Sequence, residues 1–213
     1  PLRRQRQMCI RDSFWGMSLQ DIADEIGITE AALYHYISSK DDLLNMVLSE
    51  CYDTPDADEY NAVTAAVTDN DGHRVYFYPR YCLNIALYNL QRPELVQLYS
   101  VLNGEALSPT HPAHNFFIGR HMRNWEMICS MNWILPTGVD EERFYDLYTL
   151  AMSAMDGLQY RWLGDDSMNL LEEWMSISDI IFPPSEWAGF TDPSEYDPAP
   201  DRCLLPFTLS ARQ

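Results

Sequence analysis

Residues 18–44, which read SLQDIADEIGITEAALYHYISSKDDLL, contain three closely spaced helix starts. Ser18, Thr29 and Ser39 each precede an apolar helical pattern, and hydroxyl side chains satisfy the free N–H groups of a helix start. An aspartate follows both serines three residues later, in the manner of a capping box. Gly27 ends the first pattern, because glycine readily adopts the left-handed conformation that closes many helices. The stretch therefore predicts helices at 19–26, at 30–36 and from residue 40 onward.

Two of these helices, joined at Gly27-Ile28-Thr29, have the spacing of a helix-turn-helix, whose second helix enters the major groove of DNA. A threonine hydroxyl donates to phosphate or base, and the methyl group of an alanine meets thymine. Tyrosine and histidine offer polar tips to phosphate oxygens, and a lysine at a helix start adds its charge to that of the helix N-terminus. We therefore expect DNA contacts from Thr29, Ala31, Tyr34, His35, Tyr36 and Lys40.

The same residues resemble the DNA-binding domain of the tetracycline-repressor (TetR) family. The pattern of that family, G-V-[ST]-x-x-[AT]-L-Y-x-[HY]-F-x-[SN]-K-x-x-L, is matched from Gly27 to Leu43, with Ile28 and Ile37 as conservative departures. Two later segments, 92–117 and 155–163, resemble parts of the regulatory domain of some members less closely. The resemblance is specific in the helix-turn-helix and weaker beyond it.

The resemblance implies a homodimeric transcriptional regulator, usually a repressor, which binds a palindromic DNA operator and responds to a small-molecule effector. It implies that 30–36 is the recognition helix, and it adds Glu30 to the residues expected to contact bases or the DNA backbone. It also implies a four-helix dimer interface built from the last two helices. The effector, the operator and the regulated genes are not specified by these residues.

The rest of the chain is predicted to be helical. Apolar patterns bounded by proline and glycine turns indicate helices at 79–90, 94–107, 113–134, 140–163 and 166–182. No strand alternation separates them, so the predicted fold class is all-α. We expect a DNA-binding domain at 1–50, a ligand-binding and dimerisation domain at 51–182, and an irregular tail at 183–213. The tail holds six of the thirteen prolines, although its aromatic residues leave open that it packs against the body.

Helical spacing in 140–163 indicates an apolar stripe suited to helix packing. We expect this stripe to form the dimer interface, and the alternative is that it packs inside one subunit. The residues at this spacing are Phe144, Leu147, Leu150, Ala151, Ala154, Leu158 and Trp162, and those expected at the interface are Phe144, Leu147, Ala151, Ala154, Leu158 and Trp162.

Aromatic and methionine side chains predict an apolar ligand pocket, and plain core packing is the alternative. The residues expected to line the pocket are Tyr81, Ile85, Tyr88, Met122 and Trp125. His111, His114 and His121 lack the spacing of a metal site, so no metal is expected. No phosphate loop or nucleophile elbow is present, so neither an enzyme nor a cofactor is predicted.

The charge of the chain is unusual for a DNA-binding protein, because 32 acidic residues outnumber 14 basic ones and the formal net charge is −18. Lys40 is the only lysine, and four of the thirteen arginines lie within the first eleven residues. That basic segment is either a short first helix or foreign sequence in place of the native N-terminus. The acidic balance supports an alternative function, a helical ligand-binding or interaction protein that has lost operator binding.

The five cysteines are isolated and odd in number, which favours reduced thiols and a cytoplasmic protein. No segment approaches the roughly 18 uncharged apolar residues of a membrane span, and no leader peptide is recognisable. We therefore expect no membrane partner.

Overall fold

The computed structural model of the chain describes residues 14, 16–51, 62 and 64–196. The chain divides into two compact units. Unit 1 is Pro1–Thr54 together with Leu98–Ile118, and unit 2 is Pro55–Gln97 together with Gly119–Gln213. The predicted domain boundaries at residues 50 and 182 stay predictions, and the units add that 98–118 packs with the N-terminal segment.

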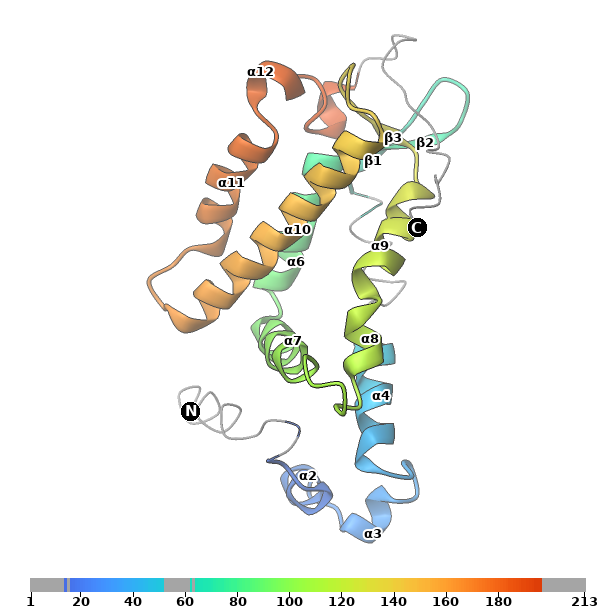
Figure 1. Cartoon of the computed structure of the whole chain (residues 1–213), viewed down its shortest axis with the longest axis vertical. Helices are drawn as coiled ribbons and strands as arrows, with labels where there is room; N and C mark the ends of the chain where they lie inside the picture. The colour runs from blue at the N-terminus through green and yellow to red at the C-terminus, as the bar shows by residue number, and fades with distance from the viewer. Residues whose placement is uncertain (1–13, 15, 52–61, 63, 197–213) are drawn as a thin grey trace. The chain divides into compact units, whose positions relative to one another are not determined.

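The helix-turn-helix in unit 1 begins with α2 (Leu19–Ile26), continues with α3 (Glu30–Leu33) and is followed by α4 (Lys40–Cys51) (Figure 1). The capping box of α2 is closed in both directions. Ser18 Oγ accepts from the Asp21 N–H at 3.1 Å, and the Asp21 carboxylate accepts from the Ser18 N–H at 2.8 Å. The predicted start of this helix is therefore confirmed, and the local hydrogen bonds explain it.

Helix α3 is shorter than the sequence predicted. It ends at Leu33, and Tyr34 to Tyr36 form a turn. Within this turn the His35 N–H donates to Ala32 O at 3.2 Å and the Tyr36 N–H donates to Leu33 O at 2.9 Å. These i→i−3 bonds tighten the end of the helix, as is common at helix termini. The prediction of a helix through residue 36 is therefore wrong at its C-terminal end.

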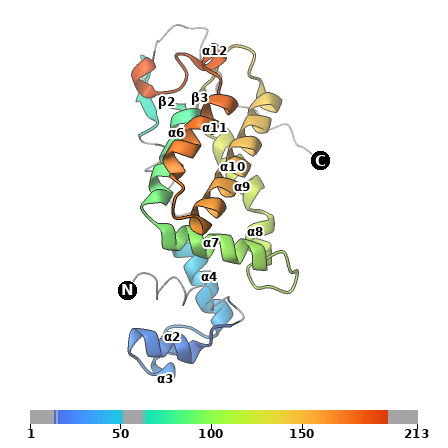
Figure 2. The same ribbon diagram turned by 90° about the vertical axis from the view of Figure 1, so that its left-hand side faces the viewer.

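Two small apolar clusters stabilise unit 1. One joins the helix-turn-helix, and its buried members are Leu19, Ala23, Leu33 and Ile37. The other packs α4 against the end of α7 (Pro93–Glu105) and against α8 (His114–Ile118). Its buried members are Leu44, Leu48, Leu102, Ala106 and Ala113. Figure 2 shows α2 and α3 together beyond the N-terminal end of α4.

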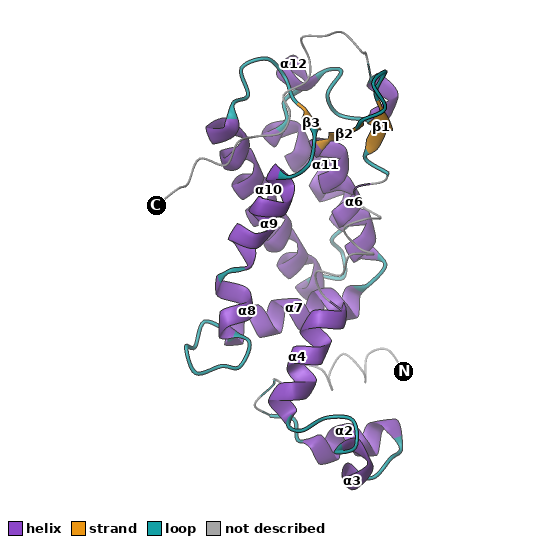
Figure 3. Ribbon diagram, turned by 90° about the vertical axis from the view of Figure 1, so that its right-hand side faces the viewer, coloured by secondary structure: helices purple, strands orange, loops and turns teal. Residues whose placement is uncertain are grey.

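Unit 2 contains a small sheet, so the prediction of a strictly all-α chain is wrong although most of the described structure is helical. Its strands are β1 (Ala66–Thr68), β2 (Arg74–Phe77) and β3 (Trp133–Ile134), in the order β1-β2-β3 (Figure 3). β1 and β2 are antiparallel, and β2 and β3 are parallel. Strands of this length are too short to show the alternation of polar and apolar residues that identifies a strand from sequence.

The helices of unit 2 surround an aromatic core. They are α6 (Tyr78–Leu90), α9 (Arg120–Cys129), α10 (Glu141–Gly164) and α11 (Leu170–Ile181). α10 and α11 lie side by side, and both views show this (Figures 1 and 2). The predicted helix 113–134 is instead α8, α9 and the strand β3, with Gly119 between the two helices.

Burial raises the pKa of the Cys82 thiol to about 12, so this free thiol stays protonated at neutral pH.

The described part of the predicted tail is structured. α12 (Pro184–Trp187) and a 3₁₀ turn (Pro193–Glu195) follow α11, and Trp187 is buried in the core of unit 2. Arg80 Nη1 lies 3.1 Å from Asp192 Oδ2, which fastens this segment to α6. Among the residues that the structure describes, no helix combines the length and the apolar composition that a membrane crossing requires.

Candidate DNA-binding interface

The turn between α2 and α3 is set by a glycine and a threonine. Gly27 has φ 75°, and its N–H donates to the end of α2, which closes that helix in the left-handed conformation. Thr29 then begins α3, because its Oγ1 accepts from the Ala32 N–H at 3.1 Å. This bond leaves the hydroxyl proton of Thr29 free to be donated to an oxygen outside the protein.

The side chains of α3 and the following turn are largely exposed. Thr29, Ala31 and His35 are exposed, and Glu30 is half-buried. Tyr34 and Tyr36 are exposed to 51% and 77%, although large aromatic side chains usually bury most of their surface. Leu33 and Ile37, by contrast, point into the core. One side of this segment therefore anchors it, and the other side presents hydroxyl, imidazole and methyl groups.

Lys40 is half-buried, and its ammonium group contacts Phe14 within unit 1. Its Nζ donates to the main-chain oxygen of Phe14 and lies 4.4 Å from the centre of the Phe14 ring. Phe14 was not among the residues singled out from the sequence. No sequence pattern identifies it, because the contact joins residues 26 positions apart.

The electrostatics of the helix-turn-helix are dominated by acids. Lys40 is the only lysine or arginine between Asp12 and His73 in the sequence. Two hydrogen bonds from Ser18 lower the pKa of Asp21, with a smaller contribution from the charge of Lys40. The positive potential available to a phosphate here comes from helix N-termini and hydroxyl dipoles more than from side-chain charge.

A helix-turn-helix in which the first helix is anchored and the second is exposed is the arrangement of one class of DNA-binding domains. Residues 6–47 match the family described as "Bacterial regulatory proteins, tetR family". The segment that contains the helix-turn-helix is therefore similar to the DNA-binding segment of tetR-family regulators, and the match covers residues 6–47. Neither the curated proteins nor the solved structures yielded a match to the chain.

The residues predicted to line a ligand pocket all lie in unit 2. Tyr81 and Trp125 are buried in the aromatic core, and Met122 is exposed. Tyr88 lies under the guanidinium group of Arg92, and Ile85 packs against the core. A surface pocket of this unit is lined instead by Pro136, Thr137, Gly138, Val139, Arg143, Glu186 and Phe190. Core packing, the alternative given above, describes Tyr81 and Trp125, and the ligand pocket stays a prediction.

The apolar stripe predicted as a dimer interface is mostly internal. Its four buried members, which belong to the core of unit 2, are Phe144, Leu147, Ala151 and Leu158. Ala154 and Trp162 are only partly buried. These four residues pack inside unit 2, as the alternative has it, and their part in a dimer interface stays a prediction. Helix α10 needs this stripe to pack against its own unit.

The histidines considered for metal binding have other surroundings. His111 lies 3.3 Å from Glu105, His114 Nδ1 lies 2.7 Å from Ala106 O, and His121 packs on the Tyr148 ring.

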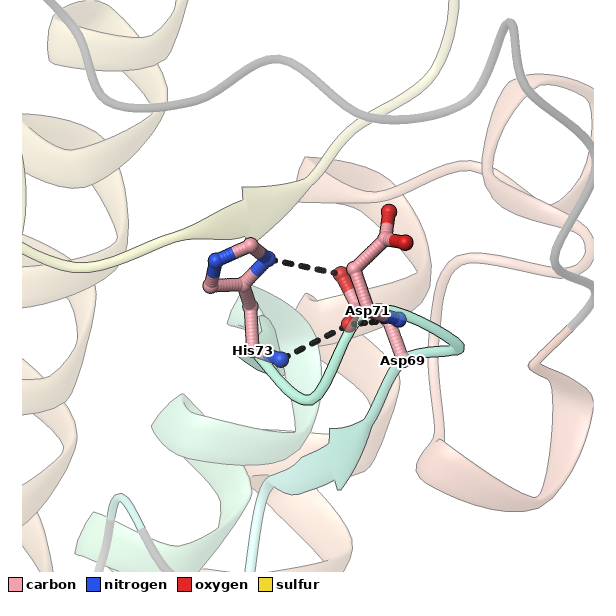
Figure 4. A group of neighbouring side chains, drawn as sticks. All are labelled: Asp69, Asp71 and His73. Carbon is pink, nitrogen blue, oxygen red and sulfur yellow. Dashed lines mark hydrogen bonds and ion pairs between the residues drawn. The ribbon is translucent and has the colours of Figure 1, made fainter.

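A group that the sequence analysis missed is Asp69, Asp71 and His73, whose ligand-type atoms lie within 4.8 Å of one another (Figure 4). Asp69 Oδ1 accepts there from the N–H groups of Asp71 and His73, at 3.0 and 2.7 Å. These bonds hold the turn between β1 and β2.

Proposed function

We propose that this chain is a ligand-responsive transcriptional regulator that acts as a repressor. It would bind a palindromic operator as a homodimer in the cytoplasm. The exposure of Tyr34 and Tyr36 in the turn that follows α3, together with the capped start of that helix at Thr29, carries the proposal. Tyrosine hydroxyls and a helix N-terminus bind phosphate without a large positive charge. This explains how a chain with a net charge of −18 approaches DNA.

The proposed DNA contacts follow from position on α3. Thr29, Glu30 and Ala31 lie in its first turn, where a recognition helix meets base edges. Tyr34, His35 and Tyr36 lie in the turn that follows and are directed to phosphates. A two-fold symmetric dimer then requires half-sites about 34 Å apart, one turn of DNA, or a multiple of that distance.

The proposed dimer uses the outward side of α10 and α11 and not the buried stripe. Leu150 and Tyr160 on α10 are exposed to 53% and 72%, and Met175 on α11 is exposed as well. Gly157 lies between the two α10 residues and has open space beside it, so a second helix can approach closely. In the proposed regulation the protein has two conformations, and one of them binds DNA. An effector that binds unit 2 more tightly in one conformation than in the other would shift the population that binds DNA.

A gel shift with DNA from upstream of the gene tests this function. We expect a discrete complex that survives an excess of unrelated DNA. The second candidate, a helical ligand-binding or interaction protein without operator binding, is favoured by the acidic balance of the helix-turn-helix. No complex at low salt, from folded dimer, supports that candidate and contradicts the first.

A further inference from the structure

The backbone of Phe14 is held from both sides within unit 1. Its N–H donates to Glu105 Oε2 at 3.1 Å, and its carbonyl oxygen accepts from Lys40 Nζ. Both partners are charged groups, which form stronger hydrogen bonds than neutral ones. Phe14 precedes α2, Lys40 begins α4, and Glu105 ends α7. A single peptide segment therefore links the beginning of the helix-turn-helix to the helix that follows it.

The ring of Phe14 strengthens the same link. The Lys40 ammonium lies 4.4 Å from the ring centre, a cation–π distance, and the His111 ring meets the Phe14 ring edge-on at 5.1 Å. Beneath the ring, the His111 side chain is fully buried and its Nε2 lies 3.3 Å from Glu105 Oε2. Glu105 is thus shared by Phe14 and His111, which fixes the position of its carboxylate.

The partners of His111 define the proton that faces Glu105. Its Nδ1 accepts from the Ala113 N–H at 3.2 Å, so a neutral His111 ring carries its proton on Nε2, on the side of the carboxylate. The buried ring, the carboxylate and the Phe14 amide form one polar group enclosed beside the apolar cluster of α4, α7 and α8. Such a group stabilises one arrangement of these segments, because the Phe14 amide, Glu105 Oε2 and His111 Nδ1 lose hydrogen-bond partners when the arrangement changes.

We infer that Lys40 is a positioning residue, which together with Glu105 clamps Phe14 and so joins both ends of the helix-turn-helix to α7. In this arrangement the ammonium is committed to a carbonyl oxygen and a ring face inside unit 1, and a phosphate contact is secondary. The consequence for DNA binding rests on the function proposed above, whereas the clamp itself is a property of the protein without DNA.

Amide hydrogen exchange of Phe14, measured on the DNA-free protein with ¹⁵N-labelled phenylalanine, tests the clamp. Lys40→Met keeps the aliphatic stem over the ring and removes the ammonium, and Glu105→Gln removes the charge of the acceptor. We expect each variant to accelerate exchange of the Phe14 amide by about tenfold. We expect the double variant to do little more than the stronger single one, since both act on one unit.

Glu94→Gln is the matched control, because Glu94 is an exposed carboxylate in the first turn of the same helix. It should leave exchange of the Phe14 amide unchanged. If Lys40→Met and Glu105→Gln leave that exchange as unchanged as the control does, the clamp does not exist and the inference is overturned.

A second arm separates positioning from phosphate contact. For a positioning lysine, Lys40→Met and Glu105→Gln both weaken operator binding, and the slope of log affinity against log salt stays as in the unmodified protein. For a phosphate contact, Lys40→Met makes that slope shallower by about 0.9 per protomer, and Glu105→Gln has no effect; this result overturns the inference. If the unmodified protein binds no operator, the proposed function fails, and the exchange measurement still decides the clamp.

Discussion

Tyr34 and Tyr36 are the residues whose placement most needs an explanation, because they expose large aromatic side chains in the turn after α3. Neither is part of the apolar cluster that holds the helix-turn-helix together. The exposed part of a tyrosine ring adds no free energy of burial, so the hydroxyl group is the part of the side chain that can bind a partner. The proposed contact with a DNA phosphate would account for the exposure of both residues.

Tyr34→Phe removes one hydroxyl and leaves the ring in place. A hydrogen bond to a charged group contributes about 1.5–3 kcal/mol, so operator affinity should fall by about tenfold or more, and thermal stability should not change. Fluorescence anisotropy with labelled duplex measures the affinity. Tyr196→Phe is the control, because Tyr196 is a half-buried tyrosine of unit 2 outside the helix-turn-helix and the proposed dimer surface. Equal affinities of Tyr34→Phe and the unmodified protein would remove Tyr34 from the interface.

His121 makes stability depend on pH. Its ring packs 4.8 Å from that of Tyr148, and burial lowers its pKa from the ordinary 6.5. The unfolded chain therefore binds the proton more readily than the folded chain does. The stabilising effect is complete above about pH 6.5 and is lost as the pH falls through the lowered folded pKa.

The measurement for His121 is thermal unfolding between pH 7.5 and 5.5. We expect the unmodified protein to lose more stability over this range than His121→Gln does, because the variant lacks the titrating group. Identical losses in the two proteins would show that His121 is not responsible. An NMR titration of the imidazole should give a pKa below 6.5.

At the scale of elements, the sequence predicted helix starts better than helix ends or strands. The start of α2 depends on Ser18 and Asp21, which are three residues apart, so the sequence alone contains that interaction. The pairing of β2 with β3, by contrast, depends on contacts between distant segments. Local patterns therefore predicted the helix-turn-helix, and they could not predict the sheet or the clamp on Phe14.

The buried stripe of α10 shows the same limit for the site. Helical spacing correctly placed Phe144, Leu147 and Leu158 on one apolar face, but it could not say whether that face meets its own chain or a second one. The predicted stripe included Leu150, which is exposed, and left out Tyr160, because the apolar pattern toward Tyr160 is interrupted by Ser153 and Gly157. Only the surroundings of α10 distinguish the two faces.

The outward side of α10 gives a prediction at this scale. Leu150→Glu and Tyr160→Glu each place a charge in the proposed interface and should convert the dimer to monomer, with unchanged circular dichroism. Light scattering after size exclusion measures the mass. Leu107→Glu, at an exposed position of unit 1, is the control. A dimer mass for both α10 variants, or a monomer mass for the unmodified chain, would contradict the proposed interface.

For the whole molecule, the acidic charge limits how strongly salt affects DNA binding. Hydroxyl groups and helix N-termini bind phosphate without displacing the counterions of DNA. Between Asp12 and His73 each chain has one lysine or arginine side chain that could displace them. We expect the slope of log affinity against log salt to be shallower than about −5 for the dimer. Titrations at four or more salt concentrations measure it. A slope near −10, as for repressors with many basic contacts, would contradict this view of the interface.

The central claim is that α3 and the turn after it bind operator DNA. Anisotropy titration of a duplex from the upstream region, with excess unrelated DNA present, tests it with the unmodified protein and with a Tyr34→Ala, Tyr36→Ala double variant. We predict saturable binding by the first and loss of binding by the second, with both proteins folded and of equal mass. Equal binding by the two proteins, or no binding by the folded unmodified protein at low salt, would contradict the claim.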